Sequence, residues 1–212
     1  MGFRHLAIEG AIGAGKSALA ERLGARLSAA VRLDDIDNPF RPDFAARRPG
    51  AAFQTQLYTL LTRHRQQVEF RQASLFHQYL VSDYLFDKDK IYAYLNLNDS
   101  ELFIYQRLYD LLSADVAAPD LVIYLQTPTP VLQRRVRARA REYEENGQVL
   151  PDPDYLRELN EAYTHFFFHY TATPLLVVDT AHLDLEWGRA TLDNIRKQMD
   201  DMTQGTRYYV PR

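Results

Sequence analysis

The sequence has no cysteine among its 212 residues, so it can form no disulfide bond, no cysteine-based zinc site and no thiol nucleophile. It has no apolar run approaching the roughly 18 residues that cross a bilayer, and its first residues lack the apolar core of a signal peptide. A net charge of −3 gives no reason to expect a polyanionic partner such as duplex DNA. These absences favour a cytoplasmic protein that binds neither a membrane nor a nucleic acid.

Short apolar runs are spaced along the chain and are separated by longer segments with helical patterns. Strands that alternate with helices indicate βαβ units, and therefore a parallel sheet covered by helices on both faces. With 46% hydrophobic residues, the chain is long enough for one domain, 1–212, with a sizeable core. We predict a three-layer α/β domain with a five-stranded parallel sheet. The predicted strands are Leu6 to Ile8, Val31 to Leu33, Leu80 to Ser82, Leu121 to Leu125 and Leu175 to Val178.

The stretch GAIGAGKS follows the first predicted strand and matches the phosphate-loop pattern of Gly, four residues, Gly, Lys and Ser or Thr. Its glycines allow backbone N–H groups to approach phosphate oxygens closely. Lys16 adds a point charge, the helix that begins there adds its dipole, and the Ser17 hydroxyl is suited to Mg²⁺. The alternative, a plain Gly-rich turn between a strand and a helix, would not explain the presence of Lys16 and Ser17. We therefore predict nucleoside triphosphate binding by Gly10, Ala11, Ile12, Gly13, Ala14, Gly15, Lys16 and Ser17.

Polar residues follow the second and third predicted strands, at the sheet edge where ligands of open α/β sheets bind. The segment LDDIDNPF, residues 33–40, places acidic side chains beside the phosphate loop, and Asp83 ends the third strand. An Asp in the first segment can accept a proton from a substrate hydroxyl or hold the metal; the alternative is a helix cap or a solvated turn. The alternating charges of residues 87–90 are typical of an exposed helix start.

Gln56 and Arg63 are seven residues apart in a long predicted helix, residues 51–72, and therefore share one of its faces. Gln offers a donor and an acceptor, and Arg offers a fork of donors, so the pair is able to recognise the edge of a base. Taken alone, the pair is more typical of a solvated helix face.

Five arginines fall within eight residues, ahead of three glutamates, in the segment 133–147. In a phosphate-loop protein this cluster indicates a lid, at about 137–150, that closes over the triphosphate and neutralises charge in the transition state. The alternatives are a nucleic-acid patch and a salt-bridged surface helix. The segment 155–170 is aromatic on nearly every face, which predicts burial by the core and by a second subunit.

Taken together and in order, these motifs resemble those of the deoxynucleoside kinase family, most closely its bacterial deoxyadenosine/deoxyguanosine kinase branch. The likeness covers nearly the whole chain, through GAIGAGKS, LDDIDNPF, FQTQLYTLLTR, VSDYLFDKDKIYA, PDLVIYLQ, RRVRARAREYEE and LNEAYTHFFFHYTATPLLVVDT. The resemblance implies a three-layer P-loop kinase fold with an Arg-rich lid, ATP as donor with Mg²⁺ at Ser17, and a small-molecule deoxynucleoside as acceptor. It also implies a homodimer built on the aromatic helices.

The resemblance further implies a role for individual residues. Asp34 matches the acidic residue that takes the proton from the 5′-hydroxyl, with Asp35 as the competing choice, and Glu144 matches the lid carboxylate that meets the sugar 3′-hydroxyl. Gln56 and Arg63 match the pair that contacts the base. The implied catalytic residues are Lys16, Asp34, Arg135, Arg139 and Arg141. Besides the phosphate loop, the implied ATP contacts are Arg139, Asp179, Asp184 and Leu185, and the implied nucleoside contacts are Asp34, Asp35, Phe44, Gln56, Arg63, Asp83, Lys88 and Glu144.

Two departures from the family pattern stand out. Many members have an acidic residue, an Arg and a Ser after the third strand, where this chain has Ser82, Asp83 and Tyr84. A lid arginine or Lys88 would have to replace the missing Arg. Ala45 occupies the place of a sugar-contacting Tyr, and losing one such hydrogen bond costs roughly 1 to 3 kcal/mol, which predicts relaxed selectivity for deoxyribose.

Two other functions remain open on the sequence. A nucleoside monophosphate kinase of the thymidylate type would need basic residues for the acceptor phosphate, and Arg63 with Arg65 would supply them. A nucleotide-binding regulatory subunit with little turnover would explain the missing Arg and Ala45. The intact Lys16 and Ser17, the lid arginines and Asp34 favour an active deoxynucleoside kinase, because a subunit that only binds has no need of a base or a lid.

Overall fold

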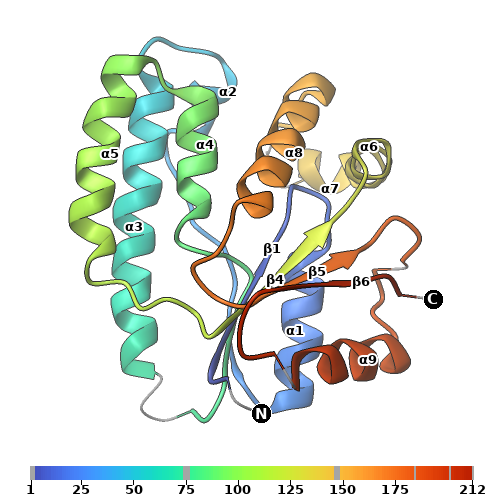
Figure 1. Ribbon diagram of the computed structural model, residues 1–212. Coiled ribbons are helices and arrows are strands. Elements are labelled where there is room, and N and C mark those ends of the chain that lie inside the picture. Colours follow the sequence, from blue (N-terminus) through green and yellow to red (C-terminus); the bar gives the residue numbers. More distant parts are fainter. Residues whose placement is uncertain (1–2, 74–76, 146–148, 184, 201, 212) are drawn as a thin grey trace.

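The computed structural model describes residues 3–73, 77–145, 149–183, 185–200 and 202–211. Its strands are β1 (His5–Glu9), β2 (Ala30–Arg32), β3 (Leu80–Ser82), β4 (Leu121–Gln126), β5 (Leu175–Asp179) and β6 (Thr206–Tyr209). These form one parallel sheet of six strands in the order β2-β3-β1-β4-β5-β6 (Figure 1). The three-layer α/β fold expected from the sequence is confirmed, and β1 to β5 coincide with the five predicted strands.

Helices cover both faces of this sheet. They are α1 (Lys16–Leu27), α2 (Arg41–Ala45), α3 (Ala51–Ala73), α4 (Lys88–Asn96), α5 (Asp99–Ser113), α6 (Thr129–Ala138), α7 (Ala140–Glu145), α8 (Pro153–Phe168) and α9 (Arg189–Asp200). Figure 1 shows α1 and α9 on one side of the sheet and the group α3, α4 and α5 on the other. None of the helices within the described ranges is long and apolar enough to cross a membrane.

The central strands β1 and β4 are buried on both faces, which is why the sequence reveals them as continuous apolar runs. They pair in parallel, with Ala7 opposite Val122. Tyr124 of β4 stacks on Phe167 of α8 at a ring distance of 4.3 Å, so the aromatic face of α8 is taken up by the core of this chain. The core therefore uses apolar runs from the sheet and aromatic side chains from α8.

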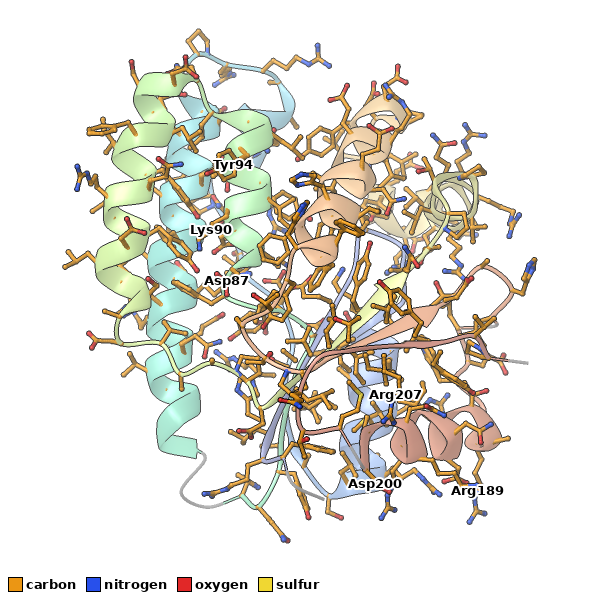
Figure 2. All side chains as sticks on the ribbon, viewed as in Figure 1. Asp87, Lys90, Tyr94, Arg189, Asp200 and Arg207 are labelled. Atoms are coloured by element: carbon orange, nitrogen blue, oxygen red, sulfur yellow. The ribbon has the colours of Figure 1, made fainter. Side chains whose placement is uncertain are left out.

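The sixth strand corrects the expected number of five. β6 pairs with β5, with Leu175 opposite Thr206 and Val178 opposite Tyr209. It lies at the sheet edge with its residues partly covered or exposed, and its sequence, TRYY, lacks the aliphatic run from which the other strands were predicted. Arg207 of β6 points toward α9, where its Nη1 donates to the carbonyl oxygen of Gln198 at 2.6 Å (Figure 2).

The order of the strands determines where a site can form. β1 lies between β3 and β4, and β2 lies beyond β3, so the carboxyl ends of β1, β2 and β3 are neighbours at one edge. Gly10 follows β1, Asp34 follows β2 by two residues, and Asp83 follows β3. Parallel α/β sheets bind ligands at this type of edge, so the fold brings the predicted residues to one place.

Candidate active site

The phosphate loop occupies the connection between β1 and α1. Gly13 and Gly15 have φ of 87° and 96°, in the left-handed region that favours glycine. A Cβ on Gly15 would also lie only 2.6 Å from Leu185 Cδ2, so the leucine side chain would have to shift as well. Lys16 Nζ donates to the carbonyl oxygen of Gly10 at 2.8 Å, which folds its ammonium over the loop. Strand, loop and helix thus take the context that the motif requires.

The loop after β5 lies against the phosphate loop, since Leu185 packs on Gly15. Arg135 of α6 holds this loop in place, because its Nη2 donates to the carbonyl oxygens of Thr180, at 2.8 Å, and Leu183, at 3.0 Å. Asp179 Oδ1 accepts from the backbone N–H of Ala181 at 2.7 Å. Asp184, expected to contact ATP, lies outside the described residues. Arg135 contacts the expected adenine loop in this structure.

Asp83 connects the phosphate loop with the segment after β2. Its Oδ2 accepts a hydrogen bond from Ser17 Oγ, and its Oδ1 accepts from the backbone N–H of Asp34 at 2.6 Å. A hydroxyl oxygen and a carboxylate oxygen therefore meet beside Lys16. Oxygen ligands of this kind suit Mg²⁺, which needs only one or two protein ligands when phosphates supply others.

Asp34 lies between two buried cations. Its Oδ1 accepts from Arg63 Nη2 of α3 at 2.7 Å, and its Oδ2 pairs with Lys88 Nζ at the start of α4. Burial raises the pKa of Asp34, but the charges of Lys88 and Arg63 oppose this and hold the pKa well below its usual range. Asp34 is therefore an ionised carboxylate at neutral pH, fixed on both oxygens. Asp35, the competing candidate, is exposed.

Asp89 is a site residue that sequence analysis missed. Its Oδ1 lies 3.3 Å from Arg63 Nη1, so Arg63 bridges Asp34 and Asp89, and the guanidinium also lies over the ring of Tyr84 at 4.9 Å. The prediction of an exposed helix start at residues 87–90 was wrong for Lys88 and Asp89, which are 5% and 2% exposed. Burial raises the pKa of Asp89 to about 6, although Arg63 and Lys88 act in the opposite direction.

Glu9 is a second residue that the sequence did not single out. This last residue of β1 is fully buried, and its two carboxylate oxygens accept from the backbone N–H groups of Gly10, at 3.0 Å, and Leu85, at 2.7 Å. Burial raises its pKa, while Lys88, Lys16 and the two N–H donors oppose the shift. A charged residue at the end of an apolar strand, directly before the phosphate loop, is the sequence feature from which Glu9 could have been predicted.

The remaining expected residues lie outside this charged cluster. Gln56 is buried on α3 and lies on the same helical face as the buried Arg63. The solvent-exposed face that the pair alone suggested is therefore not observed. Phe44 is half-buried on α2, and Glu144 is exposed on α7.

The arginines of the expected lid are exposed and form ion pairs within the lid. Arg139 pairs with Glu142 at 2.7 Å, and Arg141 pairs with Glu145 at 2.8 Å. Residues 146–148 of the expected lid lie outside the described residues. In the described part of the chain, no hydrogen bond or ion pair joins these arginines to the cluster.

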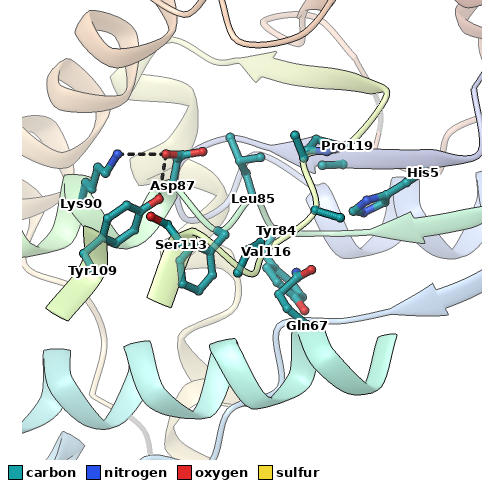
Figure 3. A pocket seen from close by; sticks show the side chains of 14 residues that line it. His5, Gln67, Tyr84, Leu85, Asp87, Lys90, Tyr109, Ser113, Val116 and Pro119 are labelled. Atoms are coloured by element: carbon teal, nitrogen blue, oxygen red, sulfur yellow. Dashed lines mark hydrogen bonds and ion pairs between the residues drawn. The ribbon is translucent and has the colours of Figure 1, made fainter. Parts of the chain in front are cut away.

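A cavity of about 160 Å³ lies beside the segment that joins β3 to α4 (Figure 3). Tyr84, Leu85, Phe86 and Asp87 of this segment form part of its lining. On its wall, Asp87 Oδ1 accepts from Tyr109 OH at 2.8 Å and pairs with Lys90 Nζ at 3.1 Å. The cavity also reaches His5 and Pro119, and its lining includes none of the residues expected to bind ATP or a nucleoside. We therefore assign the chemistry to the charged cluster and not to this cavity.

The fold and this cluster define a phosphate-loop α/β protein with a buried cluster of charged side chains beside the loop. The family model of the deoxynucleoside kinases matches residues 6–204. The chain is 30% identical over 160 residues to the deoxyguanosine kinase of Bacillus subtilis (strain 168), which covers 74% of this chain and 75% of that protein. It is 27% identical over 210 residues to a deoxyadenosine kinase of Lactobacillus acidophilus, covering 92% and 94% of the two chains.

Solved structures of deoxyadenosine kinases also match this chain. A deoxyadenosine kinase from M. mycoides, with the products dCMP and a flexible dCDP bound, superimposes with a TM-score of 0.73 at 25% identity, covering 92% of this chain and 98% of that one. The protein belongs to the deoxynucleoside kinase family. The expected fold and family are thereby confirmed.

The raised pKa of Asp89 makes a prediction about stability. The native state binds this proton more tightly than the unfolded chain, so the contribution of Asp89 to stability is present below about pH 4 and is lost as the pH rises through about 6. Between about pH 4 and pH 7.5, the wild type should therefore lose on the order of 2 kcal/mol of unfolding free energy relative to Asp89→Asn. Urea unfolding at both pH values measures this; Asp110→Asn, on an exposed part of α5, serves as control. An unchanged difference would contradict the shift.

Proposed function

We propose that this deoxynucleoside kinase transfers the γ-phosphoryl group of ATP to the 5′-hydroxyl of a deoxynucleoside, with deoxyadenosine or deoxyguanosine as the preferred acceptor. The observation that carries the proposal is the position of Asp34, which Asp83 joins to the phosphate loop and which Arg63 and Lys88 hold in place. The named activities of the bacterial relatives support a purine acceptor. The whole chain, 1–212, acts as one cytoplasmic kinase domain in this proposal.

On the donor side, the glycines of the phosphate loop and Lys16 bind the phosphates of ATP, and the loop from Asp179 to Leu185 contacts its adenine. Ser17 and Asp83 would hold Mg²⁺, and the contact between Ser17 Oγ and Asp83 Oδ2 supports this assignment. When bound, the metal neutralises charge on the phosphates. The lid arginines Arg135, Arg139 and Arg141 add positive charge when the lid closes.

On the acceptor side, Asp34 accepts the hydrogen bond of the 5′-hydroxyl and orients it toward the phosphate. A carboxylate with a strongly lowered pKa is a weak base, so its main contribution is position rather than early removal of the proton. This suits phosphoryl transfer, whose loose transition state depends on alignment and on charge neutralisation. Lys88, in contact with Asp34, takes the place of the missing arginine, and Glu144 of the lid meets the 3′-hydroxyl.

The base is bound by Gln56, Arg63 and Asp89, with the half-buried Phe44 and the exposed Asp35 as further contacts. Arg63 Nε and Asp89 Oδ2 are buried and make no hydrogen bond to other described residues. Buried polar groups without partners are costly, so these atoms are suited to donors and acceptors on a ligand. A purine edge offers such groups.

The first test measures ADP release with ATP and Mg²⁺ against deoxynucleosides, ribonucleosides and monophosphates. We expect turnover of deoxyadenosine or deoxyguanosine, lost by at least about 100-fold in Lys16→Ala, because the charge on the phosphates is no longer neutralised. Turnover of a monophosphate alone would establish the thymidylate-type alternative. Nucleotide binding without turnover would establish the regulatory alternative, and either outcome would overturn the proposal.

The second test concerns the base. Gln56→Ala should raise KM for the deoxynucleoside by about 10-fold, because a buried hydrogen bond to the base is lost, and should leave KM for ATP unchanged. Gln54→Ala, two residues earlier on the exposed face of α3, is the matched control and should leave both values unchanged. Equal effects on the two substrates would show that Gln56 supports the fold and not the base.

We also propose a homodimer, built on α3 and α5 rather than on the aromatic helix α8. Figure 1 shows α3 and α5 side by side at the outer side of the helical layer. Apolar side chains are exposed on both helices: Leu61, Val68, Phe103, Ile104 and Leu111. Leu61 and Val68 are seven residues apart and share a face, as do Ile104 and Leu111. A second copy that presents the same helices would cover this surface.

The third test is the oligomeric state. Leu111→Glu, at a side chain that is 71% exposed, should convert a dimer into a monomer, because a charge in the interface remains without a partner. Light scattering after size exclusion gives the mass. Tyr208→Glu, at an exposed residue of β6 far from α5 in the sequence, is the matched control. A dimer that survives Leu111→Glu and dissociates with Phe168→Glu would return the interface to α8.

A further inference from the structure

We propose that Tyr84 is a positioning residue for the nucleoside: its ring holds the guanidinium of Arg63 in one orientation, and this orientation determines which base the site prefers. Tyr84 lies in the segment that joins β3 to α4. The inference rests on the proposed kinase function and deepens it, because it gives a role in specificity to a residue outside the proposed substrate contacts.

The contact between the ring and the guanidinium carries the inference. The central carbon of the Arg63 guanidinium lies 4.9 Å from the centre of the Tyr84 ring. Both residues are almost fully buried, with Tyr84 1% and Arg63 2% exposed. A cation is attracted to the negative face of an aromatic ring, and the attraction is strongest where water is excluded. Two carboxylates therefore hold Arg63 at its edge, and the ring of Tyr84 supports its face.

The plane of the guanidinium determines where the free N–H group of Arg63 points. Nη2 donates to Asp34 at 2.7 Å, and Nη1 lies 3.3 Å from an oxygen of Asp89. Nε is buried and makes no hydrogen bond to other described residues, so it is the nitrogen left for a base. The guanidinium is planar and rigid, and a rotation of its plane would therefore redirect Nε and strain both ion pairs together. The position of the Tyr84 ring is thus coupled to recognition of the base.

Hydrogen bonds on both sides of Tyr84 hold its backbone. Ser82 Oγ donates to the carbonyl oxygen of Tyr84 at 2.9 Å. The next residue, Leu85, donates its backbone N–H to Glu9 Oε1 at 2.7 Å. Ser82 and Glu9 belong to the strands β3 and β1 and are fully buried. The ring is therefore fixed relative to the sheet, and it gives Arg63 the kind of rigid support that a precise binding site needs.

The hydroxyl group of Tyr84 has no part in this role. It is buried and forms no hydrogen bond of normal geometry with the described residues, although Gln67 lies beside Tyr84 on the wall of the cavity (Figure 3). The aromatic ring, and not the hydroxyl, is therefore the group that a test has to remove.

The test compares Tyr84→Met and Tyr84→Phe with the wild type, whose turnover on a panel of deoxynucleosides establishes the kinase reaction first. Methionine is flexible enough to fill the space of the ring but has no aromatic face. For Tyr84→Met we expect KM for the preferred deoxynucleoside to rise by about 10-fold, its kcat/KM advantage over the other bases to fall by at least about 5-fold, and KM for ATP to stay unchanged. Tyr84→Phe keeps the ring and should restore each value to within about twofold of the wild type.

A third variant separates this role from a purely structural one. Phe167→Leu removes another buried ring, which lies on α8 and stacks on Tyr124 at 4.3 Å. It should lower the unfolding midpoint without changing KM for either substrate. A Tyr84→Met variant that loses stability but keeps the KM and the base preference of the wild type would overturn the proposal. Equal rises in KM for the deoxynucleoside and for ATP would overturn it as well.

Fluorinated rings keep the proposal testable if Tyr84→Met does not fold. Replacing Tyr84 by phenylalanines with an increasing number of ring fluorines nearly preserves the shape of the side chain and progressively weakens the negative face of the ring. We expect KM for the deoxynucleoside to rise along this series, and a constant KM would contradict the role of the ring. A wild type without turnover on any acceptor would instead contradict the proposed function, so the two failures are distinguishable.

Discussion

The ion pairs of Asp34 with Lys88 and Arg63 are the interaction on which the rest of the site depends. Burying charged groups is costly unless each finds a partner with good geometry, and here one carboxylate serves two cations. Arg63 in turn pairs with Asp89, and the backbone N–H of Asp34 donates a hydrogen bond to Asp83. Removal of Asp34 would take away the carboxylate that pairs with Lys88, and removal of Arg63 would take away the cation that pairs with Asp89, so these residues act as one unit.

The sheet makes this unit possible because it collects short segments that are distant in the chain. Asp34 and Arg63 are 29 positions apart, and Asp34 and Lys88 are 54 apart, yet each pair is in direct contact. Strands β1, β2 and β3 are neighbours, and each ends within two residues of a polar group of the site. The helices α3 and α4 then supply cations from above the sheet edge. The central strands fix the backbone, and the chemistry depends on side chains at their ends.

Much of the fold and half of the site were predictable from the sequence for a physical reason. A phosphate loop and a short apolar run are local patterns, so residues 10–17 and β1 to β5 were predicted from neighbouring residues in the chain. The edge strand β6 has no such pattern. Lys88 and Asp89 resemble a solvated helix start, and only partners on α3 and after β2 turn them into buried groups. Glu9 escaped detection in the same way, since its partner Leu85 lies on another segment.

Arg135 joins two parts of the protein that are usually described separately. It lies in α6, which leads into the proposed lid, and both of its hydrogen bonds go to carbonyl oxygens of the loop proposed to hold adenine. A displacement of α6 therefore either carries that loop along or breaks both bonds. Nucleotide binding at the proposed adenine loop and the position of the proposed lid would thus be thermodynamically linked. If nucleotide binding favours the closed lid, the closed lid favours nucleotide binding by the same free energy.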